Sequence, residues 1–330
     1  MLTRRHSLAL GCAAVAGMLA GTVSRAFAQV LNKNARIVVG FPAGGSTDVL
    51  ARLVADRLRG KYAPVVIVDN KAGAGGRLGA EAVKNGDADG SQLLLTPCSI
   101  LWIYPHVYKK LGYDTLRDFT PVAPVGTVGF GLCVGPAVPA AVKTVADYVR
   151  WVKLDPMNAS YGSPAAGATP HFIGVMLGRA AGVALNHVAY KGGAPALQDV
   201  MGGQIPASIN VLSEVIPQLA TGKLRVLATS GAKRSTFLPD VPTFVEAGFK
   251  DVAAQEVYGI FVPSKTPADV VARLYAVVSE MARAKDFAAA IAKLSYEPAD
   301  ETPAVFAKTV QSELTRWGPV VKASGFTSEE

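Results

Sequence analysis

Residues 41–48 form a glycine-containing loop whose residue types suit the binding of an anion. The loop reads F-P-A-G-G-S-T-D, follows a β-branched run and directly precedes an apolar stripe with helical spacing. The first turn of a helix offers unpaired N–H groups and the positive end of the helix dipole, and glycines let a ligand approach the backbone closely. A small anion such as a carboxylate is therefore the expected guest. The alternative is a tight turn at Gly44-Gly45, in which Ser46, Thr47 or Asp48 only caps the helix.

The same order of strand, glycine loop and helix recurs further along the chain. Glycine-containing segments at 73–79, 163–169 and 191–194 each precede a stretch with helical periodicity. At Thr169-Pro170 we expect the hydroxyl to cap the helix and the proline to take the first helical position. Open parallel sheets bind ligands beyond the carboxyl ends of their strands, so the four loops are predicted to line one crevice.

Motifs for nucleotide binding and for a nucleophile elbow are missing. Gly73, Gly75 and Gly79 do not fit G-x-G-x-x-G, because Leu78 takes the third position, and the sequence has no G-x-x-x-x-G-K-[ST]. Ser163 is not part of a G-x-S-x-G motif. The glycine loops are thus better suited to a small acid than to a dinucleotide.

The histidines do not form a recognisable metal or catalytic set. His106, His171 and His187 occur without H-E-x-x-H or C-x-x-C, so neither a metal nor a cofactor is expected. We interpret His171, beside an apolar stripe, as a structural group. The alternative function is an exported α/β enzyme acting on a small carboxylate or ester, with Ser163 and His171 or the loop at Gly73 as its working parts.

The elements that would hold these loops are short β-branched runs alternating with longer helical stretches, the pattern of an α/β protein with a mostly parallel sheet. The chain has 330 residues, half of them apolar, which is enough for two domains. Nearly uncharged or extended stretches at 127–139 and 251–263 are predicted to cross between the two. Lobe 1 then comprises residues 29–130 and 255–330, and lobe 2 comprises residues 131–254. Strands are predicted at 35–41, 65–68, 92–96, 122–125, 132–134, 186–188, 207–209, 226–229 and 259–262.

The first 28 residues have the three parts of an export signal peptide. Arg4 and Arg5 precede an apolar stretch at 8–23, and Ala26-Phe27-Ala28 forms a small-x-small cleavage site. The paired arginines leave both the twin-arginine route and the general secretory route open. Cleavage removes three arginines and no acid, which lowers the net charge from +8 to +5. We predict that the mature protein is periplasmic.

The charge distribution limits the kinds of binding partner that are expected, and the two remaining cysteines leave two possible states. Lysines and arginines are scattered among 25 acidic residues, so nucleic acid is not an expected partner, and the excess charge is expected to attract small anions. No later segment approaches the ~20 apolar residues of a membrane span. Cys98 and Cys133 are either two packed thiols or a disulfide, because export exposes them to an oxidising compartment.

Seven ordered segments of the mature chain resemble one protein family, the Bug family of extracytoplasmic solute receptors. These receptors are the binding-protein component of tripartite tricarboxylate transporters. The segments span essentially the whole mature chain: F-P-A-G-G-S-T-D-V-L-A-R at 41–52, D-N-K-A-G-A-G-G at 69–76, Y-P-H-V-Y-K-K-L-G-Y-D at 104–114, R-D-F-T-P-V at 117–122, H-V-A-Y-K-G-G-A-P-A-L at 187–197, G-K-L-R-V-L-A-T-S at 222–230 and L-P-D-V-P-T-F-V-E-A-G-F at 238–249.

The resemblance implies a type II periplasmic-binding-protein fold, in which two α/β lobes joined by two crossover strands close on a small ligand. It implies a non-enzymatic monomer that captures a small organic acid and presents it to transporter membrane subunits or to a signalling partner. The ligand-binding residues implied in lobe 1 are Phe41, Gly44, Gly45, Ser46, Thr47, Asp48, Ala74, Gly75, Gly76 and Ser99, with Asp48 assigned to the loop and helix cap. In lobe 2 they are Ser163, Gly167, Ala168, Thr169 and Asn210.

The chain departs from the family pattern mainly in lobe 2. The loop at 163–171 lacks one glycine and one hydroxyl of the usual S-S-G-x-G-[ST]-x-x-H, and Asn210 replaces a common acid. Val257 stands where tryptophan is common, and Ala72 where proline is frequent. The lobe 1 carboxylate site is therefore better supported than any particular substrate.

Overall fold

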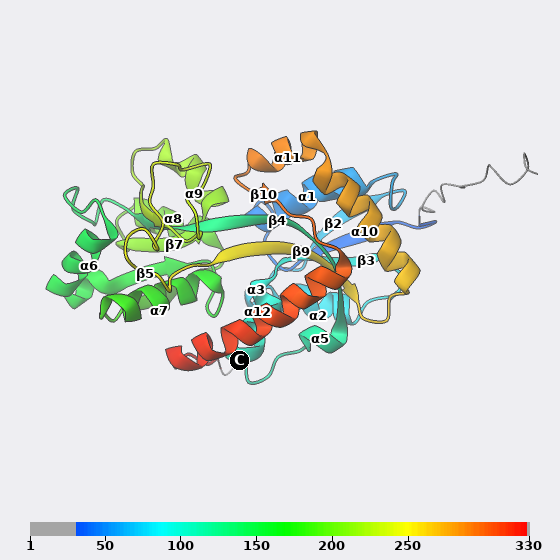
Figure 1. Cartoon of the computed structure of the whole chain (residues 1–330), viewed down its shortest axis with the longest axis horizontal. Coiled ribbons are helices and arrows are strands. Elements are labelled where there is room, and N and C mark those ends of the chain that lie inside the picture. The colour runs from blue at the N-terminus through cyan, green and yellow to red at the C-terminus, as the bar shows by residue number, and fades with distance from the viewer. Residues whose placement is uncertain (1–30, 329–330) are drawn as a thin grey trace, which may run out of the picture.

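The computed structural model describes residues 31–328, so the predicted signal peptide at 1–28 lies outside the described residues. The strands form two groups that share one long strand, and helices pack around each group (Figure 1). We call the group β2-β1-β3-β9 with its helices the first half, and the group β7-β5-β6 with β8 and its helices the second half. The strand order along the sheet is β2-β1-β3-β9-β4-β7-β5-β6, with β8 and β10 also paired to β4.

The first half begins with three parallel strands. β1 (Ala35–Val39) lies between β2 (Val66–Asn70) and β3 (Gln92–Pro97). β9 (Gln255–Pro263) pairs antiparallel with β3 and returns the chain from the second half. β1 is almost fully buried, which explains its near-continuous apolar sequence.

The second half contains a further parallel group. β5 (Ser160–Ser163) lies between β6 (Asn186–Ala189) and β7 (Ala207–Val211). The sequence did not predict β5, because Ser160-Tyr161-Gly162-Ser163 has no β-branched residue. This segment forms a strand because it hydrogen-bonds to β6 and β7 on either side, although its own residues have little preference for strands.

β4 (Phe119–Val134) is a single strand that belongs to both halves. It pairs with β9 from Phe119 to Gly129, and with β7 from Phe130 to Val134. The separate strands predicted at 122–125 and 132–134 are therefore parts of one element. The predicted lobe boundaries, after residue 130 and before residue 255, fall near this change of partner, and we retain them as a proposal. β8 (Arg225–Thr229) and β10 (Glu297–Pro298) also pair with β4.

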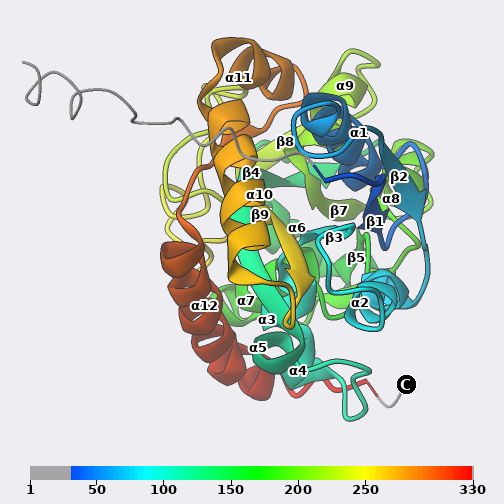
Figure 2. The same ribbon diagram turned by 90° about the vertical axis from the view of Figure 1, so that its right-hand side faces the viewer.

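Most helices pack on one half only, and one helix, α12, contacts both halves. The C-terminal helix α12 contacts β4, α3 and α4 and reaches α7 of the second half; Figure 2 shows α12 on one side of the molecule and α1 and α2 on the other. The helices are α1 (Ser46–Leu58), α2 (Arg77–Lys84), α3 (Ser99–Trp102), α4 (Tyr104–Val107), α5 (Thr115–Asp118), α6 (Val145–Leu154), α7 (Thr169–Ala181), α8 (Gly193–Met201), α9 (Leu212–Leu219), α10 (Ala268–Arg283), α11 (Lys285–Ala292) and α12 (Pro303–Ser324), with 3-10 turns at Ala74–Gly76 and Pro156–Ala159.

The start of α7 differs from the sequence prediction. Ala168 is the N-cap, Thr169 is the first helical residue and Pro170 the second, and no described side chain caps the helix. The Thr169 hydroxyl instead donates to Glu256 on β9. Gly182, in the left-handed conformation with φ of 63°, ends the helix.

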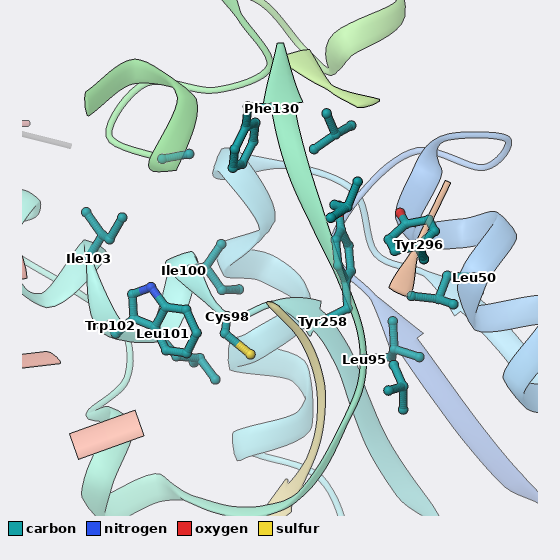
Figure 3. Close-up of a cluster of buried hydrophobic side chains, with 14 of the residues drawn as sticks. Leu50, Leu95, Cys98, Ile100, Leu101, Trp102, Ile103, Phe130, Tyr258 and Tyr296 are labelled. Atoms are coloured by element: carbon teal, nitrogen blue, oxygen red, sulfur yellow. The ribbon is translucent and has the colours of Figure 1, made fainter. Parts of the chain in front are cut away.

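The core runs continuously from one half into the other. Figure 3 shows part of it, where Ile100 lies between Phe130 and Cys98, and Trp102 lies beside Cys98. Cys98 and Cys133 are both buried free thiols, so the packed-thiol alternative holds and they do not form a disulfide. Within residues 31–328, no helix combines the length and apolar character needed to cross a membrane.

Candidate functional site

A cavity of about 600 Å³ lies between the two halves. The first half contributes residues 41–47 together with Ser99, Ile100 and Tyr104, and the second half contributes residues 191–195 and parts of α7 and α9. The linking strands β4 and β9 supply Phe130, Glu256 and Tyr258. The volume and the largely apolar lining suit a small molecule held by a few polar groups.

Helix α1 begins at this cavity. Its N-cap is Gly45, which has no side chain to cap the first turn. Ser46 and Thr47 both line the cavity, and their N–H groups lie in the turn where a helix provides no carbonyl partner. Gly44 adopts a φ of +81°, which turns the loop before the helix. The loop therefore presents main-chain donors to the cavity.

Asp48 fixes this loop through hydrogen bonds on the side away from the cavity, and it does not line the cavity. Its Oδ2 accepts hydrogen bonds from Gly44 N and Arg52 Nε, each at 2.9 Å, and its Oδ1 accepts one from Asn70 Nδ2 at 3.0 Å. Burial alone would raise the pKa of Asp48, but the hydrogen bonds from Arg52, Gly44 and Asn70 outweigh it and lower the pKa. Asp48 is only 2% exposed, so it remains a buried carboxylate that fixes the loop.

Two helices of the second half also begin at the cavity. Ala168, the N-cap of α7, lines it together with Pro170, and Gly192, the N-cap of α8, lines it together with Gly193. As at α1, the N-cap residue of neither helix makes a side-chain capping hydrogen bond. Three helices from both halves thus direct their N-terminal ends at one space, which favours a negatively charged guest.

The predicted residues Ala74, Gly75 and Gly76 lie behind the cavity wall. The Gly75 carbonyl oxygen accepts a hydrogen bond of 2.9 Å from Tyr104 Oη. A Cβ on Gly76 would lie 2.9 Å from ring atoms of Phe41. Because Phe41 and Tyr104 line the cavity, this turn supports two lining side chains and does not line the cavity itself.

Four predicted residues of the second half are buried in its structure. Ser163 is fully buried, with its Oγ 2.7 Å from His187 Nε2. Gly167 N donates to His171 Nδ1 at 3.0 Å, and the Thr169 hydroxyl donates to Glu256. Asn210 lies beneath α8, where its Nδ2 is 3.5 Å from the Gly193 carbonyl oxygen. Of all the predicted binding residues, those that line the cavity are Phe41, Gly44, Gly45, Ser46, Thr47, Ser99 and Ala168.

The histidines of the second half are structural. The rings of His171 and His187 stack with centroids 3.9 Å apart. Burial lowers the pKa of His171 to about 3, with a smaller contribution from His187, and lowers the pKa of His187 to about 4. Ser163 therefore lies beside the neutral His187 and not beside His171, and neither member of this pair lines the cavity. The pair expected for the enzyme alternative is not assembled.

Two carboxylates at the cavity were missed by the sequence analysis. Glu256, on β9, accepts from Ser99 N at 3.1 Å and from Thr169 Oγ1 at 3.0 Å. Burial raises its pKa to about 7 although these hydrogen bonds oppose the shift. Glu214, in the first turn of α9, accepts from Ser46 N at 3.4 Å, and burial raises its pKa as well. The available signal for Glu256 was its position as an acid inside the mostly apolar crossover segment at 251–263.

A two-part α/β fold, with helices from both halves beginning at a cavity between them, defines a bilobed solute-binding protein. Residues 50–326 match the family described as "Tripartite tricarboxylate transporter family receptor". The chain belongs to this family. It is 31% identical over 291 residues to "Protein BugT" of Bordetella pertussis, covering 88% of this chain and 89% of that protein.

Solved structures of relatives have the same fold. One, described as "R. palustris Rpa4515 with adipate", is 32% identical with a TM-score of 0.84, over 89% of this chain and 98% of that one. "MatC (Rpa3494) from Rhodopseudomonas palustris with bound malate" is 28% identical with a TM-score of 0.80, over 88% and 99% of the two chains. The periplasmic-binding-protein fold and the Bug family membership predicted from the sequence are confirmed. The family consists of non-enzymatic receptors, so the enzyme alternative is set aside.

Proposed function

We propose that this receptor captures a small organic acid in the cavity between its halves, with a carboxylate of the ligand at the start of α1. The observation that carries the proposal is the convergence of the starts of α1, α7 and α8 on one cavity, where none of the three N-cap residues makes a side-chain capping hydrogen bond. The bound adipate and malate named for two relatives support a carboxylate ligand. The candidate donors are the amide of Thr47 and that of Ser46, which now donates a long hydrogen bond of 3.4 Å to Glu214 Oε1 and would exchange this acceptor for the ligand.

The expected cycle is capture and release without chemical change. Micromolar binding corresponds to about 8 kcal/mol. Several charge-assisted hydrogen bonds of roughly 1.5 to 3 kcal/mol each can supply this after ordering and desolvation costs. β4 and β9 link the halves, so rotation about them would close the cavity on the ligand. Transporter membrane subunits or a signalling partner would then bind the surface of the closed, ligand-bound form.

We further propose that the mature protein acts in the periplasm as a monomer. The signal peptide predicted at 1–28 and the description of one structural relative, 33% identical with a TM-score of 0.83, as a periplasmic transporter support this location. The export route, twin-arginine or general secretory, is tested by substituting Arg4 and Arg5 with lysine. Loss of export after Arg4→Lys with Arg5→Lys would indicate the twin-arginine route.

The sharpest test of the carboxylate site removes one main-chain donor. Ser46 is the first helical residue of α1, a position that tolerates proline, and Gly45 before it is extended with ψ of 168°. Ser46→Pro therefore deletes an N–H group with little effect on the helix, whereas Ser46→Ala removes only the hydroxyl. Lys285→Pro, at the exposed first position of α11, is the matched control.

Calorimetry of organic acids identified by mass spectrometry of copurified ligand gives the readout. We expect Ser46→Pro to weaken binding about tenfold or more, the loss of one charge-assisted hydrogen bond, while Ser46→Ala and Lys285→Pro bind nearly as wild type. Equal ligand affinity of wild type and Ser46→Pro would show that the Ser46 amide does not bind the ligand.

A further inference from the structure

Glu214 occupies a main-chain donor that the proposed function assigns to the ligand. Its Oε1 accepts a hydrogen bond of 3.4 Å from Ser46 N, which joins the second half to the start of α1 in the first half. Both residues line the cavity. A ligand carboxylate that binds the Ser46 amide must therefore displace the carboxylate of Glu214. After this exchange, two carboxylates lie next to each other at one end of the cavity.

The other oxygen of Glu214 lies where a hydrogen-bond donor is missing. A Cβ built on Gly193, the first residue of α8, would overlap both Glu214 Oε2 and Asn210 Oδ1, so these two oxygens lie close together. Both are buried, and neither has a hydrogen-bond partner within the part of the chain that the structure describes. Buried acceptors without a donor cost free energy. A proton on Glu214 Oε2, directed at Asn210 Oδ1, supplies the missing donor and needs no additional space.

The Asn210 side chain presents its oxygen to Glu214. Nδ2 lies 3.4 Å from Ser208 Oγ and 3.5 Å from the Gly193 carbonyl oxygen. Because both of these atoms can accept a hydrogen bond, the donors of Asn210 are directed at them and Oδ1 remains as the acceptor. An ionised Glu214 has no donor for this acceptor, whereas a protonated Glu214 has one.

The hydrogen bonds from Ser46 are what keeps the proton affinity of Glu214 down. Burial raises the pKa of Glu214, and the hydrogen bonds from Ser46 oppose this shift. A ligand that takes the Ser46 amide removes part of this opposition and also brings a negative charge close to Glu214. Both changes raise the pKa of Glu214 further.

The surroundings of Glu214 offer little positive charge to balance a second carboxylate. The titratable and charged residues on the elements around it, within residues 31–328, are Asp48 and Arg52 of α1, Lys191 before α8, Asp199 of α8, Glu256 and Tyr258 of β9, and Tyr296 next to β10. The acids of α1 and α8 have partners of their own, Arg52 and Tyr190. Lys191 is exposed to solvent, and burial raises the pKa of both cavity-side tyrosines, so they stay neutral. Glu256, when ionised, adds a further negative charge.

We propose that Glu214 is an internal competitor for the carboxylate site, and that a bound carboxylate displaces it from Ser46 N with uptake of one proton from solvent by Glu214 Oε2. The proposal rests on the proposed function, because it requires the ligand carboxylate at the start of α1. The new O–H bond forms on Oε2 and donates to Asn210 Oδ1, and one of the two adjacent negative charges disappears. The receptor therefore binds its acid more tightly at low pH and releases it more readily as the pH rises.

Proton uptake is measured by calorimetry in buffers with different ionisation enthalpies. The mature wild-type protein is titrated with acetate, succinate, adipate and benzoate between about pH 6 and 8, where carboxylic acids are largely ionised. For the tightest binder we expect uptake of about half a proton or more, which corresponds to a loss of about threefold or more in affinity per pH unit. Binding without proton uptake would overturn the proton coupling and leave the carboxylate site intact. Failure of all four acids to bind the folded protein would overturn both.

Two variants assign the proton to its residue. Glu214→Gln imitates the protonated form, since its amide can donate to Asn210 Oδ1 and has no proton to gain. We expect it to abolish the uptake and to bind the same acid about tenfold more tightly than wild type at about pH 8. Unchanged uptake in Glu214→Gln would overturn the proposal. Loss of uptake in Glu256→Gln but not in Glu214→Gln would also overturn it, because the proton would then belong to Glu256.

The matched control is Glu280→Gln, which removes the same charge at an exposed residue paired with Lys61. It should keep the proton uptake and the pH dependence of wild type, and loss of either would mean that the effect of Glu214→Gln is one of net charge alone. Because the uptake is counted per ligand bound, partial loss of folded protein does not imitate the result.

Discussion

The carboxylate of Glu256 accepts a hydrogen bond of 3.0 Å from the hydroxyl of Thr169. Thr169 begins α7 in the second half, and the other oxygen of Glu256 accepts from the amide of Ser99 in the first half. One buried side chain on a linking strand therefore joins the two halves beside the cavity. Since Glu256 is 3% exposed, water does not replace these partners, and its protonation state affects the stability of the whole fold.

The first prediction concerns the pH dependence of stability. Burial raises the pKa of Glu256 from 4.5 to about 7. Between these pH values the unfolded chain has lost a proton that the folded protein keeps, so the contribution of Glu256 to the free energy of unfolding should fall as pH rises and level off above pH 7. The buried His171 and His187, whose pKa values are lowered, contribute a rise in the same range, so the Glu256 component is the difference between wild type and a Glu256 variant. The fall is on the order of 3 kcal/mol. Glu256→Gln keeps an acceptor for Ser99 and should remove this component from urea denaturation measured across the range. Parallel profiles of wild type and variant would contradict it.

The second prediction concerns the space above α1. Gly45 has a φ of −74°, which any residue adopts, and a Cβ there would meet only the Pro42 carbonyl oxygen at 3.3 Å. Gly45→Val should therefore fold, while its branched side chain fills the approach to the α1 amides and abolishes ligand binding in calorimetry. Gly202→Val, at an exposed position with a φ of −81° outside the cavity, is the control and should bind normally. Intact binding by Gly45→Val would argue against the carboxylate site.

The third prediction separates structure from binding at His171. Its ring accepts a hydrogen bond from Gly167 N and stacks on His187, but it does not line the cavity. His171→Ala should lower the free energy of unfolding by about 2 to 4 kcal/mol, as for other buried rings and their lost hydrogen bonds. Ligand affinity of the folded fraction should change less than about threefold, a factor below 1 kcal/mol. Loss of binding in a well-folded variant would instead place His171 in contact with ligand.

The fourth prediction tests the supporting turn behind Phe41. Gly76 has a φ of +97°, and a Cβ would press on the Phe41 ring. Gly76→Ala should cost about 1 to 3 kcal/mol of stability from backbone strain and also weaken ligand binding, since Phe41 lines the cavity. Gly60→Ala has a φ of +72° and no neighbour within 4 Å, so it should show the strain alone. Equal ligand affinities in the two variants would show that the turn at 74–76 does not affect ligand binding through Phe41.

The glycine loops could be located from the sequence because their signal is local. At residues 41–48 the strand end, the glycines and the helix stripe are consecutive, and the helix starts at Ser46 as the pattern indicates. Residues 74–76 have the same local signal, yet they turn their backbone toward Tyr104 and Phe41 and not toward the cavity. Local spacing predicts the turn, whereas tertiary packing decides which side of it faces the ligand.

Glu214 and Glu256 could not be assigned from the sequence because their roles depend on distant partners. Glu214 meets Ser46, which lies 168 positions away along the chain, and Glu256 meets Ser99 and Thr169. Acids in a helix first turn and near a strand end are common and usually solvated. Their burial follows only from the way in which β4 and β9 bring the halves together.

The contacts that join the two halves differ between the α12 side and the α1 side of the molecule. On the α12 side, Phe326 packs edge-on against His171 with ring centroids 4.5 Å apart, and Trp317 lies 6.1 Å from Phe172. On the α1 side, the halves meet at the long hydrogen bond between Ser46 and Glu214. Breaking aromatic packing costs more than breaking one weak hydrogen bond, so we expect the halves to part first on the α1 side. Solute is then expected to enter and leave past the start of α1.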